Sequence, residues 1–239
     1  MRTITLVRHA TAVDKSQDVA DFDRGLTKDG SEETRAVARA LQAEEMVPDL
    51  ILSSPAVRAF ETARKLAKIL GYPKKDIVVV DSLYENIEPP KVLELLKSLN
   101  DDFQSVMVVG HDPVLSEFAG HFGKDVSVEL PKGSALCLRS NRKKWANLLR
   151  NDGQLKFLVI AEKPAPQKSK KEVKKTLSES MQEKLAEAIV AADFPKSNKV
   201  EKKIKATAKE LADKLSKTMP KSPKAKMTAV VHRSLPADK

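Results

Sequence analysis

The sequence is poor in cysteine and aromatic residues, and it has no long apolar run. Cys137 is its one cysteine, so no disulfide can form within the chain, which fits a reducing compartment. Aromatic residues make up 4% of the chain and hydrophobic residues 41%, so a core must be built mainly from aliphatic side chains. No stretch approaches the ~20 apolar residues of a membrane span, and the apolar run at residues 3–7 is too short for a signal peptide. We therefore expect a cytoplasmic protein without a membrane span.

The positive charge is concentrated in the last third of the chain. The formal net charge is +10, yet residues 1–162 contain 23 lysines and arginines against 24 acidic residues. Residues 163–239 contain 20 lysines and arginines against 9 acidic residues. The change falls at a proline-containing segment, which is typical of a linker. We therefore predict a domain over residues 1–162, a linker over 163–169 and a basic C-terminal extension.

Strand-like and helix-like segments alternate through residues 1–162. Short aliphatic runs predict strands at 3–7, 50–52, 77–80, 106–109, 134–138 and 155–160, and helical spacing of apolar residues predicts helices at 31–46, 56–70, 90–99 and 113–122. Such alternation is typical of an α/β fold whose helices cover both faces of the sheet. We therefore expect a three-layer α/β/α sandwich with a mostly parallel central sheet.

Residues 170–219 predict a pair of basic amphipathic helices. The first helix, over residues 170–192, carries apolar residues at strict four-residue steps, and the second, over 199–219, at steps of four, seven, four and four. Pro195 lies between them and breaks the helical pattern. No comparable pattern follows, so residues 220–239 are predicted to be disordered. The two apolar stripes consist of Val173, Leu177, Met181, Leu185 and Ile189, and of Val200, Ile204, Leu211, Leu215 and Met219.

Two of the predicted strands are followed at once by a histidine. His9 comes directly after Arg8 at the end of the first strand, and His111 follows the strand at 106–109. In an open α/β sheet, ligands bind beyond the carboxyl ends of the strands. Arg58 lies in the first turn of a predicted helix, and helix N-termini attract phosphate through free N–H groups and the helix dipole. Two forked guanidinium groups and two imidazoles at one sheet edge predict a pocket for a phosphate dianion.

These motifs resemble the histidine phosphatase superfamily, which has the phosphoglycerate-mutase-like fold. Leu-Val-Arg-His at 6–9, Ser-Ser-Pro-x-x-Arg-Ala-x-x-Thr-Ala at 53–63 and Val-Val-Gly-His-Asp-Pro at 108–113 occur in the order of the family. The resemblance covers residues 1–162 and none of the C-terminal extension. Ala10 stands where the family often has glycine, and its methyl group should crowd the turn only slightly.

The resemblance implies a role for each matched residue. His9 corresponds to the nucleophile that becomes phosphohistidine, Arg8 and Arg58 to the phosphate-binding arginines, and His111 to a histidine that binds phosphate and stabilises the transition state. These groups suit phosphoryl transfer, which depends on positioning and on positive charge around the transferred group. Imidazole, with a pKa of ~6.5, is a competent nucleophile near pH 7. The chemistry requires no metal or cofactor, and the four histidines show no metal-ligand spacing.

Glu85 is the candidate for the acid that protonates the leaving group, because many relatives have an acidic residue near this point. A solvated loop carboxylate is the alternative interpretation. Only 53 positions separate Arg58 from His111, whereas mutases and acid phosphatases of this fold insert longer segments there to build a lid. The short spacing is similar to that of the SixA-like phosphohistidine phosphatases, in which the acid is often absent. It predicts an open, shallow site suited to a phosphorylated side chain of a protein.

Two further charged residues near these motifs have structural interpretations. Asp112 is expected to order the turn after His111 rather than to take part in chemistry. Arg24 lies where relatives have a loop near the phosphate, and pairing with the aspartates beside it, Asp21 and Asp23, explains it at least as well.

The sequence favours a SixA-like phosphatase that acts on phosphohistidine proteins. The alternatives are a small-molecule phosphomonoesterase of the same fold, and a phosphate-dependent binding scaffold in which the extension does the work. The intact set of Arg8, His9, Arg58 and His111 counts against the scaffold. The extension is predicted to pack on the body or dock a partner protein. A polyanion-binding arm ranks second, because the extension has one aromatic residue and one arginine for base stacking and bidentate contacts.

Overall fold

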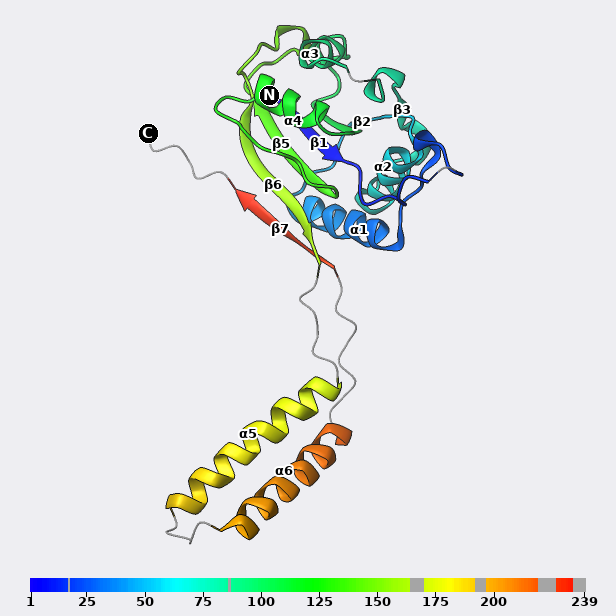
Figure 1. The fold of residues 1–239 in the computed structure, drawn as a ribbon. Coiled ribbons are helices and arrows are strands. Elements are labelled where there is room, and N and C mark those ends of the chain that lie inside the picture. Colours follow the sequence, from blue (N-terminus) through cyan, green and yellow to red (C-terminus); the bar gives the residue numbers. More distant parts are fainter. Residues whose placement is uncertain (17, 86, 164–169, 192–196, 219–226, 234–239) are drawn as a thin grey trace, which may run out of the picture. The chain divides into compact units, whose positions relative to one another are not determined.

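The chain forms two compact units. The computed structural model describes residues 1–239 except 17, 86, 164–169, 192–196, 219–226 and 234–239. One unit comprises Met1–Lys163 together with Lys226–Lys239, and the other comprises Pro164–Ala225. The second unit is therefore an insertion between two segments of the first (Figure 1).

The first unit is built on one central sheet (Figure 1). Within the described residues the sheet has seven strands, in the order β3-β2-β4-β1-β5-β6-β7. The strands β3, β2, β4 and β1 are parallel, whereas β5, β6 and β7 are joined through antiparallel pairs. The parallel half of the sheet brings the carboxyl ends of its strands to one edge. The strand bounds are β1 Arg2–Arg8, β2 Leu50–Ser53, β3 Val78–Val79, β4 Ser105–Gly110, β5 Ser134–Ser140, β6 Gln154–Glu162 and β7 Thr228–Arg233.

Helices cover both faces of the sheet. The helices α1 (Lys28–Ala43) and α2 (Val57–Leu70) pack on one face, and α3 (Pro89–Lys97) and α4 (Val114–Phe122) pack on the other (Figure 1). Successive residues of a strand point to opposite faces, so each central strand supplies apolar side chains to both layers. The predicted three-layer α/β/α sandwich is confirmed, and burial on both faces explains why its strands read as continuous aliphatic runs.

Local sequence fixes where the helices near the sheet edge begin and end. The Thr27 hydroxyl accepts a hydrogen bond from the Gly30 amide at 3.0 Å and caps the start of α1. Gly30 lies so close to the loop after β1 that a Cβ there would stand 2.0 Å from the Thr11 carbonyl oxygen. The helix α2 ends at Gly71, whose φ of 77° is in the left-handed region. The first two contacts fix the start of α1 against the loop that follows the first strand, and Gly71 ends α2.

The prediction of disorder for residues 220–239 is wrong for the segment 228–233. This segment forms β7, which pairs antiparallel with β6 and places Val231 opposite Val159. Ala229 and Val231 pack against the core on the α1 side, and Arg233 pairs with Glu44 at 2.7 Å. Residues 219–226 and 234–239 lie outside the described part of the chain.

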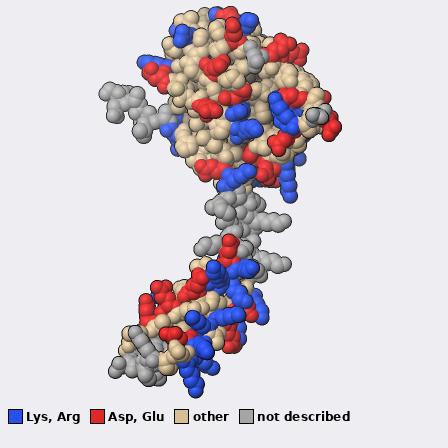
Figure 2. Space-filling view, in the orientation of Figure 1, with Lys and Arg blue, Asp and Glu red and all other residues tan. Residues whose placement is uncertain are grey.

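The second unit consists of the helices α5 (Lys170–Ala191) and α6 (Asn198–Thr218), which pack against each other. The buried residues of α6 are the small Ala208 and Ala212, and Lys174 of α5 pairs with Asp213 of α6. Leu211 and Leu215 of the predicted stripe are exposed, at 41% and 44%. Figure 2 shows many lysines on the surface of this unit, interspersed with acidic side chains. The predicted linker beyond Lys163 lies outside the described residues, as does Met219.

No helix within the described residues combines the length and the apolar composition that a bilayer crossing requires. The predicted cytoplasmic location stays a prediction.

Candidate active site

Two neighbouring strands bring the two predicted histidines together. The strand β1 ends at Arg8 and β4 ends at Gly110, and these two residues are paired in the parallel ladder. The next residue along each strand is a histidine, and the His9 amide donates to the Gly110 carbonyl at 3.0 Å. The ring centroids of His9 and His111 are 5.0 Å apart. The sheet register therefore creates the pair of imidazoles that the sequence predicts.

The hydrogen bonds of His9 identify its reactive nitrogen. Its Nδ1 lies 2.8 Å from the Ala10 carbonyl oxygen, which can only accept, so Nδ1 carries the proton. Its Nε2 lies 3.3 Å from Nε of Arg58, which can only donate. The Nε2 lone pair therefore faces the guanidinium group. The His9 side chain is buried, with 7% exposed.

Two side chains support the loop that carries His9. Thr62 Oγ1 accepts from the Ala10 amide at 3.3 Å and donates to the Arg58 carbonyl at 2.7 Å, and so links α2 to this loop. The buried carboxylate of Glu33 accepts from the amide and the hydroxyl of Thr11 at 2.8 and 2.9 Å. Both contacts hold the nucleophile candidate against helices rather than leaving it on a free loop.

The two predicted phosphate-binding arginines have different surroundings. Arg58 is buried, and its guanidinium contacts Nε2 of His9 and the carbonyl and carboxylate of Asp21, with Nη2 to Oδ2 at 3.0 Å. Arg8 donates from Nη1 to the Leu130 carbonyl at 2.5 Å and lies 3.9 Å from the Asp112 carboxylate. Nε of Arg8 is buried and has no hydrogen-bond partner among the described residues. A buried donor without a partner is costly, so this group suits an anion that would accept from it.

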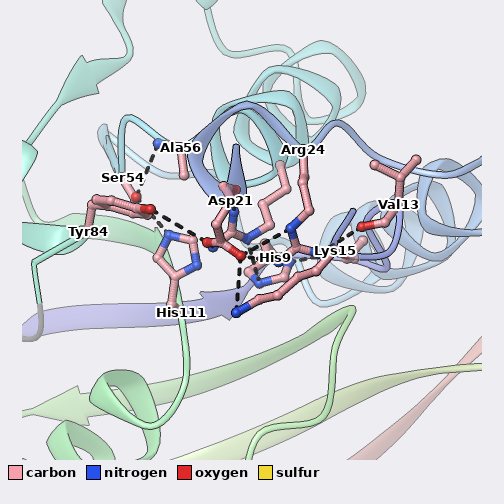
Figure 3. Close-up of polar contacts among 11 residues, drawn as sticks. His9, Val13, Lys15, Asp21, Arg24, Ser54, Ala56, Tyr84 and His111 are labelled. Carbon is pink, nitrogen blue, oxygen red and sulfur yellow. Dashed lines mark hydrogen bonds and ion pairs between the residues drawn. The ribbon is translucent and has the colours of Figure 1, made fainter. Parts of the chain in front are cut away.

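His111 is oriented by the motif that leads into α2. Its Nε2 lies 2.8 Å from Oγ of Ser54, which also lies 3.4 Å from the amide of Ala56. The Tyr84 ring meets the His111 ring edge-on at 5.7 Å between centroids. Figure 3 shows Ser54 and Tyr84 beside the His111 ring. Asp112 accepts from the Ser116 hydroxyl at 2.6 Å, which confirms its predicted part in ordering the turn.

The structure adds Asp21 to the site, at the centre of a cluster of cations (Figure 3). One carboxylate oxygen accepts from Nε and Nη2 of Arg24 at 3.1 and 2.8 Å and lies 3.5 Å from Lys15. The other contacts Arg58 and lies 3.5 Å from the Tyr84 hydroxyl. Burial raises the pKa of Asp21, but the hydrogen bond from Arg24 and the charges of Arg58, Arg24 and Lys15 lower the pKa to about 2. Asp21 is therefore ionised at neutral pH.

Arg24 pairs with Asp21, as one of its two sequence interpretations expects, and because Asp21 also contacts Arg58 this pairing lies at the site. Neither Asp21 nor Tyr84 was identifiable as a site residue from the sequence. Asp21 is one of several acidic residues in a loop, and only the contact of that loop with α2 brings it to Arg58. Tyr84 lies four residues after the apolar run at 77–80 and next to Glu85, which gave a general position but no indication of contact.

Glu85 is not among the residues that the structure brings together. It is exposed in a turn, and it makes no hydrogen bond or ion pair with a described residue. Its neighbour Tyr84 is the residue that reaches His111 and Asp21. The proposed role of Glu85 as an acid stays a prediction.

Both histidines are neutral at pH 7. Burial, the largest cause, lowers the pKa of His9 to about 4; the hydrogen bond to Ala10 raises it, and the charges of Arg58, Arg8 and Lys132 lower it. Burial likewise lowers the pKa of His111 to about 3, together with the nearby His9 and Arg58. A neutral imidazole keeps its lone pair, which a nucleophile needs. The surrounding cations that depress these pKa values are the groups that would attract a phosphate.

The depressed pKa of His9 predicts a loss of stability in mild acid. The unfolded chain takes up a proton on this residue near pH 6.5, whereas the folded chain does so only near pH 4. The contribution of neutral His9 to the free energy of unfolding is therefore present above pH 6.5, and it decreases as the pH falls toward 4. Between pH 6.5 and 5, His9 alone should account for about 2 kcal/mol. Urea unfolding at the two pH values should show a smaller decrease in the His9→Gln variant than in the wild type, and equal decreases would contradict the prediction.

Comparisons with known proteins point to one family. The sequence model of the histidine phosphatase superfamily (branch 1) matches residues 4–87. The structure of the proposed phosphohistidine phosphatase SixA of Agrobacterium tumefaciens is 31% identical, with a TM-score of 0.51, and the match covers 57% of this chain and 91% of that one. The structure of the protein histidine phosphatase SixA in complex with tungstate has a TM-score of 0.57 at 20% identity, covering 65% of this chain and 95% of that one.

A curated relative, an uncharacterised chloroplastic protein of Arabidopsis thaliana, is 27% identical over 151 residues, which are 60% of this chain and 69% of the relative. Among the described residues, no group of three or more His, Cys, Asp or Glu side chains is arranged to hold a metal ion. The fold, the matched sequence and the identity to a SixA structure lead to one assignment. The chain is an enzyme of the histidine phosphatase superfamily and belongs to its SixA-like branch.

Proposed function

We propose that this phosphatase removes the phosphoryl group from phosphohistidine side chains of proteins, with His9 as the nucleophile. The observation that carries the proposal is the position of His9 Nε2, which is unprotonated and faces Arg58 beside His111. Arg8, Arg58 and His111 supply the charge and hydrogen bonds that a transferred phosphoryl group requires.

The reaction has two transfers. In the first, Nε2 of His9 forms a bond to phosphorus while the bond from phosphorus to the substrate imidazole breaks, and the substrate imidazole takes up a proton. In the second, water attacks phosphorus, the bond to Nε2 breaks, and inorganic phosphate leaves. Arg58 and Nε of Arg8 bind the equatorial oxygens of the transferred phosphoryl group. These oxygens would give Nε of Arg8 the hydrogen-bond acceptor that it lacks among the described residues. The phosphoryl group competes with Asp21 for Nη2 of Arg58.

The leaving group decides between phosphohistidine and phosphomonoester substrates. An alcohol leaves poorly unless an acid protonates its oxygen, whereas imidazole is protonated readily near neutral pH because its pKa is ~6.5. Glu85, the predicted acid, is exposed and without a contact to the site. Asp21 is ionised at neutral pH and so has no proton to give. This favours a substrate whose leaving group needs little help, and the SixA relatives are described as phosphohistidine phosphatases.

The second unit is proposed to influence which molecules the enzyme meets, through docking of a partner protein. In support, α5 and α6 form a compact unit of their own, and Leu211 and Leu215 of α6 are exposed. Every residue with a proposed part in the chemical step belongs to the first unit.

A substrate panel with one acid variant tests the proposed leaving group. The wild type should hydrolyse a phosphohistidine protein and phosphoramidate far more efficiently than sugar phosphates. Glu85→Gln should leave phosphohistidine hydrolysis nearly unchanged, because the leaving imidazole needs no positioned acid, and should slow any residual phosphomonoester hydrolysis. The measurement is kcat/KM for each substrate at pH 7, with Glu88→Gln as the matched control.

Two results would contradict the proposal. High efficiency of the wild type on sugar phosphates would favour a small-molecule phosphomonoesterase. Large and equal losses on both substrate classes in Glu85→Gln would make Glu85 a structural or phosphate-binding residue instead.

A further inference from the structure

A basic cavity lies between α1 and α2, on the outer side of these helices. It has a volume of about 430 Å³, which is within the range of small-ligand sites. Its lining includes Ile69 and Glu61, but none of the residues assigned to the phosphoryl-transfer site. The remaining lining residues are cations from both helices and from the segment after α2: Arg35, Arg39, Arg64, Lys65, Lys68 and Lys74.

This concentration of positive charge is unusual for the part of the chain that contains it. Residues 1–162 are close to neutral, with 23 lysines and arginines against 24 acidic residues. In the cavity six cations face one carboxylate, that of Glu61, which also accepts from the Leu26 amide at 2.7 Å. Like charges that line one cavity repel one another, and an anion bound there would relieve this repulsion.

Most of the cations have no acidic partner. Arg35 pairs with Glu32, but Arg39, Arg64, Lys65, Lys68 and Lys74 form no ion pair with any residue that the structure describes. Arg64 lies over the Phe60 ring at 5.9 Å, which helps to hold its guanidinium at the cavity wall. Arg39 and Arg64 are exposed on facing helices, so their donors are free to meet a ligand from two sides.

The size and chemistry of the cavity restrict the ligand. Ile69 is the one apolar residue among the lining residues and no aromatic residue belongs to them, so the cavity offers no aromatic ring on which a nucleoside base could stack. Five negative charges on a carboxylate peptide would need at least five residues, which is much more volume than a few linked phosphates. Guanidinium groups bind phosphate oxygens in a bidentate manner, and lysines bind them as point charges.

We propose that the α1–α2 cavity binds a compact, phosphate-dense anion, such as an oligophosphate or the polyphosphorylated part of a small molecule. This site is separate from the phosphoryl-transfer site, and it binds its ligand without reaction. The lining contains six cations and one carboxylate, so the ligand should carry a similar excess of negative charge. All lining residues belong to the first unit.

Calorimetric titration of the full chain with inorganic tripolyphosphate tests this site. Binding of one ligand at the cavity should weaken about 25-fold in the double variant Arg39→Gln/Arg64→Gln, since each unit charge at contact distance in water contributes roughly a factor of five. The matched control Lys202→Gln/Lys209→Gln removes the same charge from α6 and should bind like the wild type. Arg58→Ala removes the phosphate clamp of the catalytic site and should keep the cavity binding. Thermal unfolding checks that each variant is folded.

Three results would overturn the proposal. The first is wild-type affinity in Arg39→Gln/Arg64→Gln. The second is loss of all tripolyphosphate binding in Arg58→Ala, which would place the ligand in the catalytic site. The third is tighter binding of a pentaglutamate peptide or of a short single-stranded oligonucleotide than of tripolyphosphate. If the double variant lost this tighter binding, the cavity would be assigned to an acidic protein or to nucleic acid.

Discussion

Replacement of His9 by alanine should abolish turnover of every phosphorylated substrate. In the site, Nε2 of His9 is the unprotonated nitrogen that faces Arg58, whereas Nε2 of His111 is engaged by Ser54. No other nucleophile at this sheet edge occupies an equivalent position among the described residues. Rapid quenching of the wild type with labelled phosphohistidine protein should trap phosphate on the enzyme that is labile in acid and stable in alkali, as expected for a phosphoimidazole.

Control variants separate the nucleophile from its surroundings. His121→Ala, on α4 and outside the site, should keep wild-type turnover and trapping. Arg58→Ala should remain folded and lose about 10²-fold or more in rate, because a charge-assisted contact made in the transition state contributes ~3 kcal/mol. Label that persists in His9→Ala, or that is stable in acid, would exclude His9 as the nucleophile. Near-normal activity in Arg58→Ala would remove that arginine from the clamp.

The parts of the site that could be predicted are those that depend on local sequence and strand direction. A histidine directly after a buried strand lies at the carboxyl edge of the sheet wherever the strands are parallel, so His9 and His111 were expected at the same edge. The position of Arg58 was also predictable from local sequence. Its helix starts two residues after Pro55, shortly after the end of a strand, so Arg58 lies in the first turn of that helix at the same sheet edge. The strand order that makes β1 and β4 neighbours does not follow from periodicity and was not predicted.

The residues that could not be predicted reach the site through contacts distant in sequence. Asp21 contacts Arg58 37 positions away, and Tyr84 approaches Asp21 from 63 positions away. Their loops have no periodic pattern that would fix a direction for either side chain. For Glu85, residue type and approximate position suggested a role as an acid, which stays a prediction; the structure places it exposed in a turn and brings its neighbour Tyr84 to the site. One position along a turn changes which side chain meets the pocket.

The strand β7 shows why composition misled the prediction at the C-terminus. Its sequence, Thr-Ala-Val-Val-His-Arg, is six residues long and is flanked by lysine, serine and proline, so the surrounding composition resembles that of a disordered tail. Its partner β6 ends at Glu162, and along the sequence the whole second unit separates the two strands. The pairing is favourable because β6 would otherwise be an open sheet edge, with Val159 and Phe157 beside it. Such a partner cannot be found from a local pattern.

The position of β7 predicts opposite outcomes for two deletions of the extension. A chain that ends at Glu162 loses β7 and the packing of Ala229 and Val231 on the core, so it should be destabilised by about 2 kcal/mol or more. For a protein of this size, that corresponds to a decrease in Tm of about 4–8 °C. A chain in which residues 164–225 are replaced by a short glycine-containing turn keeps β7. It should retain both the wild-type Tm of the first unit and full activity on phosphoramidate.

Point variants distinguish the loss of the strand from the loss of the helices. Val231→Asp in the intact chain places a charge against the core on the α1 side, so it should reproduce the destabilisation of the truncated chain. The control His232→Asp lies on the exposed side of the same strand and should not destabilise the chain. Thermal unfolding followed by circular dichroism, with phosphoramidate hydrolysis at 25 °C, measures both effects. If the internal deletion unfolds as readily as the truncation, α5 and α6 contribute to the stability of the phosphatase unit itself. If the truncated chain is as stable as the internal deletion, β7 is dispensable, and the sheet is complete at β6.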